Sequence, residues 1–490
     1  MTKDFKPASR EQLSTLRKNM GELISSIFPL LVDCINTYNA LQKVTDRNEI
    51  VILWEDLLRL QYFVYFSMID LSASLRADLE TEIIIEKRIH LKYVNVSIVE
   101  IFKALFGFRG SKRQTLWTYF KKDIRLFEDV IDEEKINAID SLVLQFENHY
   151  YPIKDYRRDF AIHYDFDAIK VYDYLVSISE KDEVDKVSNY IEILQSVSIL
   201  VRDTTTKYKI SLKILQSDDF GLQDNEISNI FHDKDGKMQF TASDVIHTYG
   251  KQLDTIARSY RLPKKIEKLL DIKIDVTELK DLKKTFNPIL IILYIYLDVC
   301  ATILAYLRSN YYIEKQLHLR HLNVIVYEGV KKIYGFSGSL SNNHLWKDYL
   351  YPILISLNKQ DVVTKAEEVN CKLKCLSKLP LINNKDFRNL SVHILDKKRK
   401  DYIPKAIKEL ISLSPESEMK KALLLMELLP TVIYLSKEVF VYEGSLYNRR
   451  QQEKMEAMMA PFVHIKQIAN DEQTKKILDS VINDLSNLLK

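Results

Sequence analysis

An internal repeat is the feature of this sequence that most constrains its fold. The segment IEKRIHLKYVNV (85–96) matches IEKQLHLRHLNV (313–324), and the same displacement along the chain relates Asp70 to Asp298. We call this displacement the repeat offset. Further matches, at the repeat offset or a slightly larger one, are Gly107 with Gly335, Phe108 with Phe336, Trp117 with Trp346, and Lys154 with Lys385. Because loop insertions produce such a drift, the sequence predicts a tandem duplication of one domain.

The patterning within each copy is helical. Gly occurs 10 times and Pro 11 times in 490 residues, well below their usual shares of about 7% and 5%, which leaves few turn residues for a hairpin-rich fold. Apolar residues recur at helical spacing through about 20–43, 49–78, 80–106, 112–147, 158–180 and 186–215, and again through about 246–490. Gly107 and Gly335 each follow a long apolar run, where a helix cap favours positive φ. We therefore expect an all-α fold with two homologous helical-bundle domains that form an internal pseudo-dimer.

The predicted domain boundary lies in a polar stretch at about 216–244. A chain of this length exceeds one ordinary core, since domains average roughly 150 residues. The sequence predicts an N-terminal domain over 1–240 and a C-terminal domain over 241–490.

One stretch, Pro288–Arg308, is near the length of a membrane span but carries Asp298 in its middle. Its counterpart in the first copy contains Glu55, Asp56 and Arg59, too many charges for hydrocarbon. Both are expected to be buried core helices, with no membrane partner. The opening residues lack an apolar h-region, so a cytoplasmic location is the expectation.

Net charge and cysteine content leave the function open. With a net charge of +3, any affinity for nucleic acid must come from local basic patches. The four cysteines are too few and scattered for a disulfide framework. Cys371 and Cys375 share a helix face at i, i+4, but two thiols do not complete a zinc site, and both are expected to be buried as small hydrophobes.

A carboxylate and an imidazole recur at the same spacing in both copies. Glu86 precedes His90 by four residues, and Glu314 precedes His318 likewise. Such a pair can bind metal, but carboxylate bundles use a Glu-x-x-His spacing with further carboxylates, for which Asp70 and Asp298 are the obvious candidates. We expect a buried polar network that joins helices, with Asn95 and Asn323 as members, and assign no metal or other cofactor. Trp117 and Trp346 are expected in the core and not as stacking platforms for bases.

An Arg/His pair also recurs in both copies. Arg158 precedes His163 by five positions and Arg388 precedes His393 by five, so the Arg and the His are displaced equally between the copies. The residues after each His have diverged completely, as YDFDAIK against ILDKKRK, while the Arg and His remain. Asp159 and Asn389, directly after each Arg, are candidate helix N-caps.

Arg and His together suit cleavage of an RNA backbone. Arg offers a planar fork of donors for phosphate oxygens, and His exchanges a proton near neutral pH. A His can take the proton of the 2′-hydroxyl as it attacks phosphorus, while Arg stabilises the phosphorane oxygens. Positions five apart on a straight helix do not converge, so two copies facing each other would form a shared cleft.

The helical setting with Arg158-Asp159 and Arg388-Asn389 ahead of His163 and His393 resembles the HEPN superfamily (higher eukaryotes and prokaryotes nucleotide-binding). The architecture covers both halves, whereas the motif is short and degenerate. This resemblance implies a metal-independent endoribonuclease whose site forms between two motifs and whose product is a cyclic phosphate. It further implies a toxin or phage-defence effector with RNA, including tRNA, as its substrate.

Carried over, the resemblance casts His163 and His393 as acid–base residues and Arg158 and Arg388 as phosphate ligands. Arg157 is an alternative to Arg158, because Lys-Asp-Tyr-Arg aligns with Lys-Asp-Phe-Arg. Further supporting and RNA-binding candidates are Asp159, Asn389, Glu86 and Glu314, and the basic run Lys397, Lys398, Arg399 and Lys400. A neutralising or sensing protein partner and a homo-oligomer are also expected.

Two other readings remain open from the sequence. The chain can be a non-catalytic helical scaffold that binds a protein, nucleotide or RNA, with structural Arg and His pairs. It can also be a carboxylate–His metal protein built on Glu86, His90 and their copies. The nuclease predicts cleavage in chelator, the scaffold predicts none, and the metal protein predicts bound iron, manganese or zinc.

Overall fold

The computed structural model describes residues 10–43, 49–108, 115–124, 132–150, 168–207, 242–258, 276–336, 344–380, 382 and 413–468. Helices joined by turns make up this part of the chain, and no strand occurs in it. The all-α prediction is therefore confirmed for the described residues. The predicted boundary, about 216–244, lies almost wholly outside them, so the division into two domains stays a prediction.

In the first half the helices are α1 (Arg10–Leu41), α2 (Glu49–Leu79), α3 (Ile84–Leu105), α4 (Leu116–Ile124), α5 (Glu133–His149), α7 (Ala168–Ser177) and α8 (Glu180–Lys207). In the second half they are a helical stretch over 242–258, then α10 (Val276–Arg308), α11 (Tyr312–Ile333), the π-helical η2 (Leu345–Leu350), α12 (Tyr351–Ser356), α13 (Gln360–Lys378) and α16 (Pro415–Ile468). The apolar run predicted over 112–147 is divided between α4 and α5. The reason is a cap within the run, because Asp132 accepts a hydrogen bond from the Lys135 backbone N–H at 3.1 Å and so begins α5.

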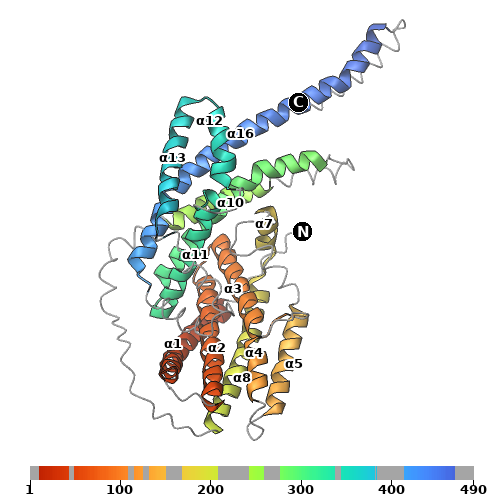
Figure 1. The fold of residues 1–490 in the computed structure, drawn as a ribbon. Helices are drawn as coiled ribbons and strands as arrows, with labels where there is room; N and C mark the ends of the chain where they lie inside the picture. The colour runs from red at the N-terminus through yellow and green to blue at the C-terminus, as the bar shows by residue number, and fades with distance from the viewer. Residues whose placement is uncertain are drawn as a thin grey trace.

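Each half is built around one long helix that is buried over most of its described length. In the first half, α1, α3, α4 and α8 pack on α2, and α5 packs on α8. In the second half, α11 and α16 pack on α10, and α13 packs against α16 (Figure 1). A helix that is buried on all sides requires partners on all sides, which these neighbours provide.

The apolar stretch of α10, Phe286–Arg308, is long and apolar enough to cross a membrane, with a mean hydropathy of 2.2 over its most apolar window. That window is 100% buried inside the protein. The prediction that this stretch is a buried core helix is confirmed. By length and composition alone, the core helix of a folded domain passes the same test as a membrane span.

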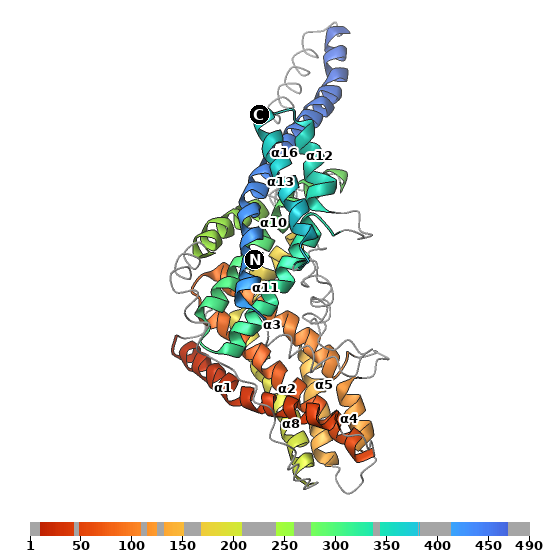
Figure 2. The same cartoon turned by 60° about the vertical axis from the view of Figure 1, so that its left-hand side comes forward.

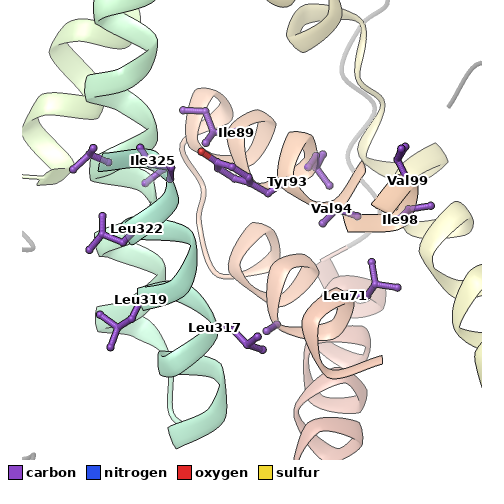
Figure 3. Close-up of a cluster of buried hydrophobic side chains, with 14 of the residues drawn as sticks. Leu71, Ile89, Tyr93, Val94, Ile98, Val99, Leu317, Leu319, Leu322 and Ile325 are labelled. Carbon is purple, nitrogen blue, oxygen red and sulfur yellow. The ribbon is translucent and has the colours of Figure 1, made fainter. Parts of the chain in front are cut away.

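The two halves contact each other through their central helices. α3 and α7 of the first half pack against α10, and α2 packs against α11. Figure 3 shows apolar side chains between α11 on one side and α2 and α3 on the other, with Tyr93 of α3 pointing toward α11. The core is therefore continuous across the boundary between the halves. The C-terminal end of α16 projects beyond the other described helices in both views (Figures 1 and 2).

Matching glycines end α3 and α11. Gly107 has φ 77° and Gly335 has φ 83°. Their backbone N–H groups donate to the carbonyls of Phe102 at 3.0 Å and Val330 at 3.2 Å. Both predicted caps at positive φ are confirmed, because a residue with a Cβ is strained in this conformation.

Candidate functional site

Two reciprocal ion pairs join the halves of the chain. Lys92 of α3 donates to both oxygens of Asp298 of α10, at 2.8 and 2.7 Å. Arg320 of α11 donates from Nη2 to Asp70 Oδ1 of α2 at 2.9 Å. Lys92 matches Arg320 and Asp70 matches Asp298, each at the repeat offset. Each half therefore contributes the same two positions, one acid and one base, to pairs that cross between the halves.

These four side chains are buried, which makes the pairing specific. Taking an ion out of water is costly, and the partner's charge offsets that cost only where the geometry is good. Removing one member leaves the other charge buried and unpaired, at a cost of about 3–5 kcal/mol. The ion pairs consequently add little net stability. Their main effect is to favour one arrangement of α2 and α3 on α10 and α11.

A second layer of exchanged pairs lies beside the first. Arg76 of α2 donates from Nη1 to Glu314 Oε2 at 3.0 Å, and Arg308 of α10 donates to Glu86 Oε1. Glu86 and Glu314 match at the repeat offset. Glu86 also accepts a hydrogen bond from the Thr81 hydroxyl at 2.7 Å. The structure thus places both carboxylates between the halves, in a buried polar network of the kind that the sequence predicted.

The two matching carboxyl groups are held differently. Burial opposes ionisation of Glu86, but the nearby His90 ring and the Arg308 guanidinium outweigh it and lower its pKa. Burial raises the pKa of Glu314 to about 7, in spite of the attraction of Arg76. The two glutamates differ because their neighbouring histidines differ. His90 Nε2 lies 3.5 Å from Glu86 Oε1 and favours the ionised carboxylate. His318, which matches His90, is so buried that its pKa lies well below its usual value, so it does not supply a positive charge beside Glu314.

Aromatic rings fill the space between the ion pairs. Tyr93 of α3 stacks on His321 of α11, with ring centroids 5.7 Å apart and planes at 15°. His321 matches Tyr93 at the repeat offset. Burial and the neighbouring Arg320 lower the pKa of His321 to about 4. This ring is therefore a neutral packing group at physiological pH.

A third set of contacts uses matching residues within each half. Lys186 of α8 donates to Asn95 Oδ1 at 2.7 Å and to Glu183. In the second half, Asn323 donates to Glu418 Oε2 at 2.6 Å, and Lys421 of α16 donates to Glu418. The two asparagines match at the repeat offset. Glu183 matches Glu418 and Lys186 matches Lys421 at a slightly larger offset, which is the same for both pairs. The asparagines therefore tie α3 to α8 and α11 to α16, Asn95 as an acceptor from the lysine and Asn323 as a donor to the glutamate.

The two predicted tryptophan anchors lie in the core. Trp117 is 4% exposed and Trp346 is 0% exposed. Each indole Nε1 donates to a matching helix, Trp117 to Asp140 Oδ1 at 2.6 Å and Trp346 to Asn370 Oδ1 at 3.3 Å. The prediction that these rings are core residues and not stacking platforms is confirmed.

The prediction that Cys371 and Cys375 are buried was wrong. Cys300 is buried, but Cys371 and Cys375 are exposed on α13. They do share a helix, and the apolar residues that bury α13 are Val369, Leu373 and Leu376, which occupy the neighbouring positions of its heptad. The described residues contain no group of three His, Cys, Asp or Glu side chains able to hold a metal ion.

The predicted Arg/His motifs lie outside the described residues. These are Arg157, Arg158, Asp159 and His163 in the first half, and Arg388, Asn389, His393, Lys397, Lys398, Arg399 and Lys400 in the second. The nearest described neighbours along the chain are α7, which begins five residues after His163, and Ile382, six residues before Arg388.

The first of these neighbours bridges the halves. α7 packs against α3 of its own half and α10 of the other. Its Tyr172 hydroxyl donates to Asp254 of the helical stretch over 242–258, and Asp254 also pairs with Arg258 at 2.7 Å. The residues that follow His163 therefore lead into a helix anchored on the second half.

Several residues that join the halves were missed from the sequence. Lys92 and Arg320 carry a visible signal, because both are basic at matching positions within the repeated segment. Lys186 and Lys421, which join helices within each half, carry the same signal at the larger offset. Arg76 and Arg308 do not match at the repeat offset, so no repeat signal marks them.

Comparisons of the chain with models of protein families, with curated proteins and with solved structures gave no match.

Proposed function

We propose that the two halves form an internal pseudo-dimer of homologous helical domains. In a two-fold interface, residue i of one subunit contacts residue j of the other, and j contacts i. The ion pairs Lys92–Asp298 and Arg320–Asp70 follow this rule, because each position pairs with the counterpart of its partner. The ion pairs Glu86–Arg308 and Glu314–Arg76 follow it in part, because the glutamates match and the arginines do not. These contacts support a duplicated chain that keeps the interface of a dimer.

The function that this arrangement supports best is metal-independent cleavage of RNA at a composite site between two HEPN-like motifs. The single observation that carries it is the reciprocal pairing of the halves, since a composite site needs two copies of the motif held opposite each other. The bridging position of α7, directly after the first motif in the sequence, also supports it.

In this proposal His163 and His393 exchange protons with the 2′-hydroxyl and the leaving 5′-oxygen. Arg158 or Arg157, together with Arg388, stabilises the charge on the phosphorane oxygens. Glu86 and Glu314 support the site indirectly, because their ion pairs with Arg308 and Arg76 hold the halves together. The biological setting that we propose is a cytoplasmic toxin or antiviral effector acting on RNA, including tRNA, and held in check by a protein partner.

The direct test is incubation of the purified protein with total RNA and tRNA in EDTA. We expect discrete cleavage with 2′,3′-cyclic phosphate ends, and none of a matched oligonucleotide with 2′-deoxyribose, which lacks the attacking group. The double variant His163→Ala/His393→Ala should not cleave, whereas His247→Ala, at an exposed histidine, should cleave like the parent. Cleavage that persists in the double variant would refute the assignment.

A non-catalytic helical scaffold is the second candidate. It is favoured by the fact that the matched residues Asp70, Asp298, Lys92, Arg320, Glu86 and Glu314 are all buried and engaged in ion pairs between the halves. The scaffold predicts that no RNA is cut under any condition, including added nucleotides and divalent metals.

A further inference from the structure

Between Lys420 and Val441, α16 is buried on most of its surface, and its exposed positions form one narrow line. Its buried side packs against α10, α11 and α13. The exposed positions follow one another at alternating steps of three and four residues, which is the spacing of the contact line in a coiled coil. They are Lys420, Leu423, Glu427, Tyr434, Lys437 and Val441, with the partly buried Pro430 between Glu427 and Tyr434. We call this set of residues the α16 seam.

Three residues of the α16 seam have large, exposed apolar side chains. Leu423 is 37% exposed, Tyr434 42% and Val441 65%. Single apolar side chains on a surface are common and need no explanation. These three, however, are separated by whole numbers of helical turns, because a turn takes about 3.6 residues. They therefore lie on one line along the helix.

The matching helix of the first half shows that the fold does not require these apolar residues. α8 matches α16 at the slightly larger offset defined by their Glu and Lys residues. At this offset, three apolar residues of the α16 seam correspond to polar residues of α8: Leu423 to Ser188, Pro430 to Gln195, and Val441 to Thr206. Tyr434 has an apolar counterpart, Ile199, and the charges of Glu427 and Lys437 have counterparts of the same sign. The added apolar residues therefore distinguish the α16 seam from α8.

The α16 seam is complementary to itself in one antiparallel register. Two copies of α16 can cross between Pro430 and Tyr434, so that each copy runs back along the other. In a two-fold interface, residue i contacts residue j and j contacts i, so each contact forms twice. The contacts are Leu423 with the partner's Val441, Glu427 with the partner's Lys437, and Pro430 with the partner's Tyr434. Apolar residues then meet apolar residues, and each acid meets a base.

The other simple arrangements lose this complementarity. A parallel pair in register places Glu427 against the partner's Glu427 and Lys437 against the partner's Lys437. Sliding the antiparallel pair by seven residues in one direction places Lys420 against the partner's Lys437. Sliding it in the other direction places Tyr434 against the partner's Lys437 and leaves Glu427 without a basic residue of the seam opposite it. Like charges that meet across an interface disfavour the complex, so the charges select the first register.

We propose that two copies of this chain associate through the α16 seam as an antiparallel, two-fold symmetric dimer. The partner is a second copy, because the apolar and charged residues of the seam complement one another within one sequence. The seam lies on the side of α16 opposite its buried residues, so the dimer leaves the contacts between the two halves of each chain unchanged. This inference is independent of the proposed ribonuclease function.

Sedimentation equilibrium of the full chain measures this association, over roughly 1 to 100 μM, where complexes of micromolar affinity assemble. The variant Leu423→Ser/Val441→Thr installs the matching residues of α8. It should raise the dissociation constant by roughly 100-fold or more, because both copies lose buried apolar surface. The control is Ile199→Ser, which removes an apolar side chain that is 45% exposed on α8, and it should dimerise like the parent. Thermal melts establish that both variants fold.

Charge reversal tests the register. Glu427→Lys places like charges against each other at both contacts, as does Lys437→Glu, and each should raise the dissociation constant by about tenfold or more. The variant Glu427→Lys/Lys437→Glu restores opposite charges and should return the constant to within about threefold of the parent. The proposal is overturned by a parent that stays monomeric throughout the range, or by equal dimerisation of the parent and Leu423→Ser/Val441→Thr. A double reversal that dimerises no more tightly than the single reversals would also overturn it.

Discussion

Positions 93 and 321 match in the repeat, but the first half has Tyr there and the second has His. The imidazole stacks on Tyr93, with its Nε2 3.6 Å from Asp70 Oδ1 and 2.9 Å from Arg320 Nη2. His90 and His318 also lie nearby. Because the ring is buried beside a guanidinium, the interface accommodates it only as the neutral base. The matched Tyr introduces no such restriction between pH 4 and 7, since its ordinary pKa is about 10.

This burial predicts an acid-dependent loss of stability. The pKa of His321 is about 4 in the folded protein, against about 6.5 in an unfolded chain. As the pH falls from about 6.5 to about 4, the unfolded chain binds a proton that the folded chain does not, so the free energy of unfolding falls by roughly 3 kcal/mol at most. The His321→Gln variant should lack this component, and urea denaturation of both proteins from pH 4 to 7 measures it.

Replacement of the exposed His247 by Gln is the control, and it should leave the pH dependence of the parent unchanged. A difference in unfolding free energy between the parent and His321→Gln that does not vary from pH 4 to 7 would contradict the account of this ring.

At the scale of the helices, the local sequence determines the caps that end α3 and α11. It does not determine which helices pack against each other. Positive φ at Gly107 and Gly335 follows from the end of an apolar run at a glycine. The burial of α2 and α10 follows from their apolar composition. In contrast, the sequence identifies Asp70 and Asp298 as candidates but does not give their partners, because Lys92 and Arg320 meet them only after the two halves pack.

The exposure of Cys371 and Cys375 could not be predicted for a related reason. Their i, i+4 spacing establishes a shared face but not which face of α13 packs on α16. The Arg/His motifs, by comparison, were identified from the sequence alone, and their placement is a prediction that the described residues leave untested.

The matched caps differ in how tightly they are packed. A Cβ added at Gly335 would lie 2.4 Å from His344 Nε2, whereas one added at Gly107 would lie 3.0 Å from Thr115 Cγ2. Positive φ alone costs an L residue about 1–2 kcal/mol. We therefore expect Gly107→Ala to lose about that much stability and Gly335→Ala to lose more, as measured by urea denaturation.

The steric part of this loss has its own test. The double variant Gly335→Ala/His344→Ala removes the ring that the new Cβ would meet, so its stability should depart from the sum of the two single changes in the stabilising direction. Equal losses in Gly107→Ala and Gly335→Ala would show that the contact with His344 plays no part.

At the scale of the whole molecule, the described helices of the two halves share one buried interface, and the duplication that we propose would give the chain two copies of the Arg/His motif. The buried ion pairs make that interface specific, and the continuous core makes it stable.

The central claim is that the two Arg/His motifs form one site. The most direct measurement compares initial rates of RNA cleavage by the parent, His163→Ala and His393→Ala in EDTA. A composite site predicts that either single change lowers the rate by about 100-fold or more, because each histidine serves the same reaction as acid or base. If each single variant retains about half of the parent's rate, the motifs act as independent sites and the account is wrong.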